Sequence, residues 1–282
     1  MKIILSRKGF DSQYGRVPSP ILPDGTIISF PIPSSSGRPL GDIETTLGPM
    51  HSLVSDLSAG MWLPKTSVHL DPDLQASSVP RKRGWKPSFG QVGSAQRHLE
   101  RQGVCVGDVF LFFGWFRPVE LQHGKWRYRP GVPGIHSLFG WLQVGEILQL
   151  SERPELPAWM DDHPHVAHAE RMGAFNTLYV ATTRLALKGV RKQLPGAGVF
   201  APWSERLQLT APGKSRSVWR LPSWMAPTQG GAILSYHGSP ERWSTVDGHS
   251  QLKSVAKGQE FVREVDSLDG YRWLTKLVES HS

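Results

Sequence analysis

Apolar residues along the chain gather in short runs that are typical of buried strands. Residues 2–5 are isoleucine- and leucine-rich, and residues 109–116 form a continuous aliphatic and aromatic run. Such a run predicts a strand that is buried on both faces. Residues 137–150 and 176–182 have a similar character. We expect 137–150 to pair with 109–116, and 176–182 to form a further strand.

Two other segments show the spacing of a helix. In residues 91–102 the apolar side chains of Val92, Ala95 and Leu99 recur every three or four positions. Residues 268–278 repeat this pattern near the end of the chain. Both segments therefore predict short amphipathic helices.

Glycine, proline and serine mark the connections. Residues 23–25 (PDG) predict a turn, and 26–30 an extended segment after it. Residues 31–41 and 62–90 are punctuated by breakers and predict loops. Residues 118–135 predict a loop-rich, solvent-exposed excursion.

Predicted strands outnumber predicted helices, which favours an α+β fold. We expect one domain over residues 1–282, with a mixed, mostly antiparallel sheet and few short helices. The chain has 282 residues, of which 39% are hydrophobic and 20% charged. A chain of this size and composition buries a sizeable core without covalent staples.

The cysteine content and the N-terminus indicate a cytoplasmic protein. Cys105 is the single cysteine, which excludes an intramolecular disulfide and a multi-thiolate zinc site. The sequence starts with an apolar run too short for a signal peptide. No apolar stretch is long enough for a membrane span, so no membrane partner is expected.

The charge points to a polyanionic partner. The formal net charge is +8, from 32 Lys and Arg against 24 Asp and Glu. A basic surface attracts nucleic acid or nucleotides through counterion release. The alternative is a charge that serves solubility alone.

The first candidate site follows the first strand. Ser6, Arg7 and Lys8 precede a glycine, a combination suited to holding a phosphate group. Asp11 follows and is placed for acid, base or metal-ligand work. The alternative is an exposed charged turn.

The second and third candidate sites contain histidine. His69 and Asp71, with a distant His165 or His98, match a two-histidine, one-carboxylate iron site, but any H-x-D pattern matches by chance. The alternative is an Asp-Pro turn with a solvent-facing histidine, so no metal is assigned, and the set His69, Asp71 and His165 is kept as the alternative. Without a metal, His69 and Asp71 suit general acid–base catalysis. His165 belongs to a histidine-rich run that either shuttles protons or is a plain polar loop. Asn176 opens a predicted strand, where its amide either reads a base edge or caps a turn.

The fourth feature is the high number of tryptophans, some of which lie beside lysine or arginine in the sequence. The chain has 11 Trp. Trp85 lies beside the basic stretch Arg81, Lys82 and Arg83, which suits base stacking and phosphate contacts. The alternatives are core filling for the ring and a solvated turn for the basic stretch.

Several familiar signatures are absent from the sequence. It contains no GxGxxG, GxxxxGK[ST], GxSxG or HExxH pattern. The zinc-deaminase signature needs a CxxC pair, which one cysteine cannot supply. These absences exclude ordinary Rossmann dehydrogenases, P-loop ATPases, α/β hydrolases and zinc deaminases.

The segments KIILSRKGFDS, SPILPDGTIISFPIP, HLDPDL, GQVGSAQRHLERQGVCVGDVFLFFGWFR, HPHV and NTLYVA resemble the nucleotide modification associated domain 3 family. The resemblance implies an α+β domain in a bacterial or phage protein linked to DNA base modification or to defence against modified phage DNA. It names no reaction and no cofactor. The polar positions that it carries over are Ser6, Arg7, Lys8, Asp11, Asp24, His69, Asp71, His98, Gln102, Asp108, Arg117, His165 and Asn176.

Three hypotheses follow. The first is a base- or nucleotide-modifying enzyme, in which Asp11, His69, Asp71 and His165 carry the chemistry. Phosphate and base contacts would then come from Ser6, Arg7, Lys8, Arg81, Lys82, Arg83, Trp85, Gln102, Arg117 and Asn176. The second is a non-catalytic reader of modified bases that resembles PUA-like domains. The third is a structural subunit that contacts partner proteins of a modification or defence operon.

Overall fold

The computed structural model describes residues 1–187, 193–228, 231–255, 258–265 and 267–282. The α-helices of these ranges are α1 Met50–Leu57, α2 Gly93–Arg101, α3 Pro164–Ala167 and α4 Leu268–Glu279. The first eight strands are β1 Lys2–Arg7, β2 Ser19–Ile21, β3 Ile32–Pro39, β4 Glu44–Thr45, β5 Gly48–Pro49, β6 Ser67–His69, β7 Ser88–Gln91 and β8 Val109–Gln122. The others are β9 Lys125–Tyr128, β10 Ile135–Gln149, β11 Thr177–Ala181, β12 Ala197–Val199, β13 Val218–Leu221, β14 Trp243–Val246, β15 His249–Lys253 and β16 Glu260–Glu264.

One large sheet organises the chain. Its strands follow the order β16-β1-β8-β10-β11-β7, with β12 pairing with β10 and both β2 and β9 pairing with β8. β1 and β2 run parallel to β8, and the other pairs in this sheet are antiparallel. β1 and β8 are internal strands, and for this reason their apolar runs are buried on both faces.

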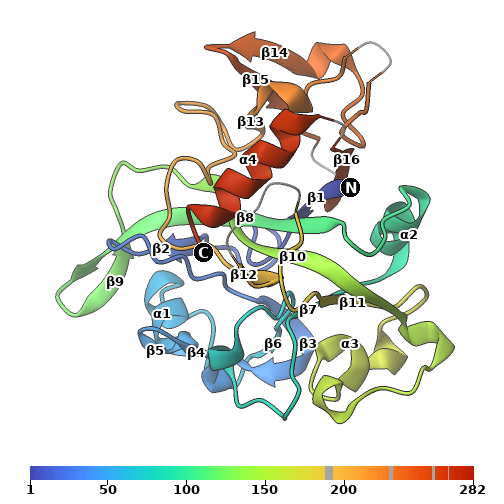
Figure 1. The fold of residues 1–282 in the computed structure, drawn as a ribbon. Coiled ribbons are helices and arrows are strands. Elements are labelled where there is room, and N and C mark those ends of the chain that lie inside the picture. The colour runs from blue at the N-terminus through green and yellow to red at the C-terminus, as the bar shows by residue number, and fades with distance from the viewer. Residues whose placement is uncertain (188–192, 229–230, 256–257, 266) are drawn as a thin grey trace.

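The smaller elements lie on the two sides of the long strands (Figure 1). In this view β8 and β10 cross the middle, and α4 and the three-stranded sheet β13-β15-β14 lie above them. The α1, β3, β6 and α3 elements lie below. β6, β7, β11 and α3 come together at the lower right, although they are far apart in sequence.

The α+β class and the mixed, mostly antiparallel sheet are confirmed. Each long apolar run forms a strand, and β8 pairs with β10 in antiparallel fashion. Both predicted helices are present as α2 and α4. Residues 118–135 contain the hairpin of β8 and β9, so part of the predicted excursion is a regular, largely exposed ribbon.

Three local predictions were wrong. Residues 62–90 were predicted as a loop, but they contain β6 and most of β7. Residues 31–41 were predicted as a loop, but they contain β3, which pairs with β6 at its ends. Prolines are tolerated in β3 because it belongs to a two-stranded ribbon, where they remove few ladder bonds. Conversely, residues 26–30 were predicted to form an extended strand, but they form none. Ile27 makes only an isolated bridge to Ile21.

None of the helices in the described ranges has the length and apolar composition needed to cross a membrane.

Candidate functional site

Two segments distant in sequence bring His69, Asp71 and His165 together. His69 ends β6, and Asp71 follows it after one residue. His165 lies in α3, a short helix that begins at a proline and is capped by the His163 side chain. Proline at the first position of a helix is pre-organised for the turn and donates no N–H that would need a partner.

The three side chains converge on one carboxylate oxygen. His69 Nε2 lies 3.8 Å from Asp71 Oδ2, and His165 Nε2 lies 3.7 Å from the same oxygen. The His69 and His165 ring centroids are 5.1 Å apart. One ligand atom from each residue lies within 4.8 Å of the others, and His165 is buried. Among the described residues this is the one such group of histidine and acidic side chains.

The second oxygen of Asp71 is held by the protein. Its Oδ1 accepts a hydrogen bond of 2.8 Å from the Gly90 amide in β7. His163 Nε2 lies 3.5 Å from Oδ1, at the long limit for a hydrogen bond. Because His163 Nδ1 faces the His165 amide, the neutral His163 ring carries its proton on Nε2, toward Asp71. Oδ1 is thus engaged, and Oδ2 is left to His69 and His165.

Asn176 fixes the protonation of His165. The Asn176 Nδ2 donates to the His165 carbonyl at 2.8 Å, so its Oδ1 is the atom that faces His165 Nδ1 at 2.7 Å. An amide oxygen only accepts, and His165 Nδ1 must therefore carry the proton. In a neutral ring the Nε2 lone pair then points at Asp71. Both polar ends of the Asn176 side chain are engaged by His165.

Gly90 provides the space for the His165 ring. A Cβ at Gly90 would lie 2.2 Å from His165 Cδ2, far inside contact distance. The same residue donates its amide to Asp71. Gly90 is not among the residues predicted for the site, although a glycine inside a strand is a signal for close approach of another group.

Burial sets the charge state of the site. It lowers the pKa of His165 to about 4, against the attraction of Asp71. Burial also lowers the pKa of His69. For Asp71 burial favours the neutral acid, but His163 and the other imidazoles outweigh it, and the pKa falls to about 2. At neutral pH an anionic carboxylate therefore faces neutral imidazoles.

This donor set fits a divalent transition-metal ion. Ligands with bonds of about 2.0–2.2 Å stand roughly 3–3.6 Å apart around one ion. The two distances of 3.7 Å and 3.8 Å are slightly longer, so small rotations of the rings close the set. Two imidazoles and one carboxylate leave coordination positions open for a substrate or water. Asn176 then has the role of the outer partner that orients a ligating histidine.

A second polar cluster joins β1, β7 and β16. Glu260 Oε1 in β16 accepts hydrogen bonds from Ser6 Oγ at 3.0 Å, Lys8 Nζ at 2.9 Å and Gln91 Nε2 at 2.6 Å. Lys8 Nζ also lies 4.4 Å from the Phe89 ring centroid. Its positive charge contributes to the lowered pKa of His69, which places Lys8 within electrostatic reach of the histidine site. Gln91 and Glu260 are not among the residues predicted from the sequence.

Arg7 and Asp11 lie away from the histidine site. Arg7 stacks over Phe113, whose ring contacts Trp219 and Phe261 on the opposite side of β1 from Lys8. Side chains alternate along a strand, and Ser6 and Arg7 therefore face opposite ways. Asp11 interacts electrostatically with Arg7. Of the four predicted catalytic residues the fold gathers His69, Asp71 and His165.

The basic stretch is tied to acidic groups. Arg81 forms two hydrogen bonds of 2.6 Å with Asp73, and it covers the Trp85 ring at 4.2 Å. Lys82 pairs with Asp161 at 3.0 Å, and Arg83 is exposed. One face of Trp85 is therefore occupied by Arg81.

The other predicted contacts are dispersed. Gln102 is exposed at the end of α2. Arg117 lies over Tyr128 at 5.1 Å and donates to the Arg129 carbonyl. His98, the alternative distant ligand, contacts Ser235 Oγ at 2.9 Å.

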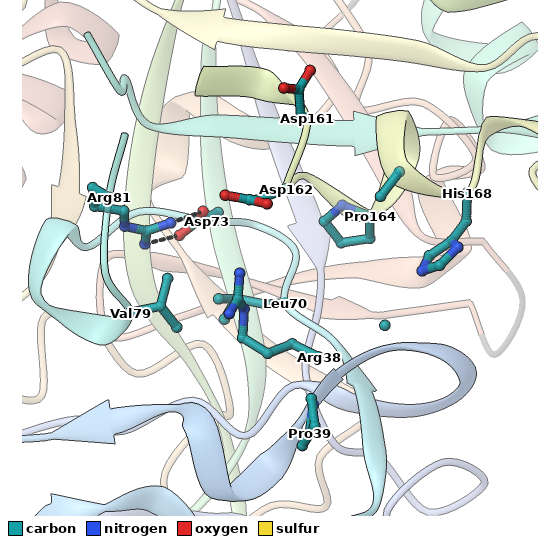
Figure 2. Close-up of a pocket in the computed structure, with 12 residues that line it drawn as sticks. Arg38, Pro39, Leu70, Asp73, Val79, Arg81, Asp161, Asp162, Pro164 and His168 are labelled. Atoms are coloured by element: carbon teal, nitrogen blue, oxygen red, sulfur yellow. Dashed lines mark hydrogen bonds and ion pairs between the residues drawn. The ribbon is translucent and has the colours of Figure 1, made fainter. Parts of the chain in front are cut away.

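A cavity of about 270 Å³ adjoins the histidine site (Figure 2). Leu70, which separates His69 from Asp71, and Pro164, which precedes His165, contribute to its wall. The Arg38 side chain extends into it from β3, and His168 and Asp162 border it. Its size is near the lower end for small-molecule sites.

Comparison with known proteins gives one family. No curated protein and no solved structure shows a significant match to the chain. The model of nucleotide modification associated domain 3 matches residues 2–264, which includes every residue of the histidine site and Glu260. The chain therefore belongs to the nucleotide modification associated domain 3 family.

Proposed function

We propose that this protein is an enzyme that modifies a nucleotide or a nucleic-acid base at a divalent metal ion bound by His69, Asp71 and His165. Family membership supports nucleotide modification as the process. The setting that we propose is base modification in bacterial or phage DNA, or in the defence against it. The net charge of +8 suits a phosphate-bearing substrate.

One observation carries the proposal. Asn176 holds the proton of His165 on Nδ1, and the Nε2 lone pair therefore faces an anionic oxygen at 3.7 Å. Two acceptors that face each other in a buried site repel unless a cation lies between them. His69 Nε2 is a second nitrogen that faces the same oxygen, at 3.8 Å. A divalent ion satisfies all three atoms at once.

A bound ion would polarise a substrate oxygen or activate a ligand for attack. The protein's own groups supply the rest. His163 and the Gly90 amide hold Asp71, and Asn176 holds His165. Lys8, paired with Glu260, lies within electrostatic reach of His69 and favours the neutral imidazole that a metal ion requires.

Metal titration tests the site. Chelator-treated protein is titrated by calorimetry with Mn²⁺, Co²⁺, Zn²⁺ and, without oxygen, Fe²⁺. We expect at least one of these ions to bind once per chain, and Asp71→Asn to abolish this binding. Asp161→Asn is the matched control, because Asp161 is exposed and pairs with Lys82. Equal affinities in both variants would rule out the proposed centre.

Nucleoside analysis tests the activity. Nucleosides are analysed by mass spectrometry from DNA, RNA and nucleotide pools of cells that produce either the wild type or Asp71→Asn. We expect a new nucleoside in one of the three pools with the wild type only. A protein that binds modified DNA equally well with and without metal, and yields no new nucleoside, would instead be a reader.

A further inference from the structure

The sheet face opposite the cluster of Ser6, Lys8 and Glu260 carries two arginines without a direct carboxylate partner among the described residues. Arg7 of β1 lies over the Phe113 ring of β8, with 5.8 Å from Cζ to the ring centroid. Arg216 lies over Trp115, two residues further along β8, at 4.1 Å. Phe113 and Trp115 point to the same face because side chains alternate along a strand. The two guanidinium groups therefore share one face.

His136 and Trp219 fix the position of Arg216 on this face. His136 in β10 pairs with Trp115 across the strands, and its ring lies 5.6 Å from the Phe113 ring. Trp219 Nε1 donates to the Arg216 carbonyl at 2.9 Å and contacts His136 Nδ1 at 3.2 Å. These interactions fix the Arg216 backbone beside the strand that presents Phe113 and Trp115.

The positive charge on this face is incompletely balanced. Asp11 attracts both arginines, while Arg7 and Arg216 repel each other. The Oδ1 atom of Asp11 accepts the amides of Gln13 and Tyr14. Within the described ranges neither guanidinium group forms an ion pair or a hydrogen bond with a carboxylate. Two cations thus share the influence of one acid.

Two buried donors on the same face also lack acceptors. Arg7 Nε and Trp115 Nε1 are both inaccessible to solvent and have no hydrogen-bond partner in the described part of the chain. A buried N–H without an acceptor destabilises the folded protein. Both donors belong to residues of the arginine face, which therefore has more N–H groups than acceptors.

We propose that Arg7 and Arg216 bind a phosphate group on this face, separate from the histidine site. A guanidinium group offers planar, paired donors that match phosphate oxygens. Half-buried arginines exclude part of the competing water, and the aromatic rings beneath them hold their planes. The phosphate belongs either to a nucleic-acid backbone or to a free nucleotide.

Binding assays on the metal-free full-length protein test this proposal and distinguish the two sources. The probes are a labelled single-stranded oligodeoxynucleotide, followed by fluorescence anisotropy, and thymidine 5′-monophosphate and inorganic phosphate, followed by calorimetry. We expect Arg216→Gln to weaken at least tenfold the binding of each probe that the wild type binds. For the oligonucleotide, the slope of log affinity against log salt should fall by about one for each phosphate that the variant no longer neutralises.

The control variant is Arg206→Gln, which removes the same charge from an exposed position. Arg7→Lys keeps the positive charge but removes the paired N–H donors of the guanidinium group, and we expect it to weaken binding. Circular dichroism and thermal melting establish that each variant is folded. Oligonucleotide binding alone identifies a backbone phosphate, and mononucleotide binding a free nucleotide. Arg216→Gln and Arg206→Gln with equal affinities on every probe would overturn the proposal. Because no metal is present, this result is independent of the proposed activity.

Discussion

The two faces of the sheet around β1 differ in whether their charged side chains are paired. On one face, Lys8 forms an ion pair of 2.9 Å with Glu260, and Ser6 and Gln91 donate to the same carboxylate oxygen. On the other, Arg7 and Arg216 share the attraction of Asp11 without a direct bond. Adjacent residues of the chain, Arg7 and Lys8, belong to the different faces.

The difference indicates what each face lacks. Pairing with Glu260 compensates Lys8, so the ammonium group and its neighbours are stable without a ligand. The histidine site, which lies at the edge of β7, instead has an excess of lone pairs and lacks a cation. The arginine face has an excess of N–H donors and lacks an anion. Complementary deficits of this kind fit a protein that binds a metal ion and a phosphate-bearing molecule at separate places.

The largest expected effect is on stability, at Glu260. Glu260→Ala removes the acceptor of Ser6, Lys8 and Gln91, and leaves an ammonium group almost buried without a partner. We expect a decrease of about 3–5 kcal/mol in the free energy of unfolding, measured with urea.

The exposed Glu241→Ala serves as the control for Glu260→Ala and should change stability by less than about 0.5 kcal/mol. Adding Lys8→Met to Glu260→Ala should recover part of the stability, since the unpaired charge is then gone. A decrease below about 1 kcal/mol for Glu260→Ala would show that the pair is not a structural centre of this face.

The next effect is on metal affinity, at Gly90. In Gly90→Ala the added methyl group would displace the His165 ring, because the new Cβ falls 2.2 Å from Cδ2. We expect at least about a hundredfold decrease in affinity by calorimetry, since Nε2 leaves its position beside Asp71. In Gly238→Ala the new Cβ meets the flexible Ile233 side chain at 3.2 Å, and metal affinity should stay unchanged. Unchanged affinity in Gly90→Ala would mean that His165 is no ligand.

Asn176 has a smaller effect on the same measurement. Asn176→Ala leaves the His165 ring in place. The variant cannot form the 2.7 Å hydrogen bond to Nδ1, so the proton of the neutral ring is no longer held on that nitrogen. We expect a decrease of about 10–100-fold in metal affinity, the range for outer partners of ligating histidines. Asn176→Asp keeps the acceptor for Nδ1 but loses the donor to the His165 carbonyl, and should restore part of the affinity. If Asn176→Ala and Asn176→Asp weaken binding equally, the amide acts through backbone structure and not through the ring.

Some of the fold was predictable because burial on both faces leaves a strong pattern. The run at residues 109–116 lies inside β8, and that at 137–150 is close to β10. By contrast, β3 contains serines and prolines and forms a two-stranded ribbon with β6. Its strand state depends on its partner, which a local pattern does not contain.

The histidine site was only partly predictable for a related reason. His69 and Asp71 are two residues apart, but His165 arrives from a helix almost a hundred residues later, so the sequence offered several possible partners. The sequence analysis grouped Arg7 with Lys8 at one phosphate site, but the alternation of side chains along a strand places them on opposite faces. Nothing local linked Glu260 to Lys8, because that ion pair depends on the pairing of β1 with β16.

The smallest effect concerns His136, which reports on the arginine face. Burial is the main reason that the pKa of His136 falls to about 3, and Arg7 and Arg216 add to it. The unfolded chain takes up this proton near pH 6.5, whereas the folded chain does not until about pH 3. Stability therefore decreases as pH falls from 6.5, by at most about 1.4 kcal/mol per pH unit from this residue.

His136→Asn keeps an acceptor near Trp219 and removes the titration. Urea unfolding between pH 7 and pH 5 should therefore show a shallower decrease in stability than in the wild type, while His249→Asn, at an exposed position, should follow the wild type. A phosphate bound between the arginines would offset their repulsion of an imidazolium. Its addition should raise the His136 pKa measured by NMR, an effect expected to vanish in Arg216→Gln. If phosphate leaves this pKa unchanged in the wild type, the anion does not bind where the two arginines meet, and the contrast between the two faces loses its functional meaning.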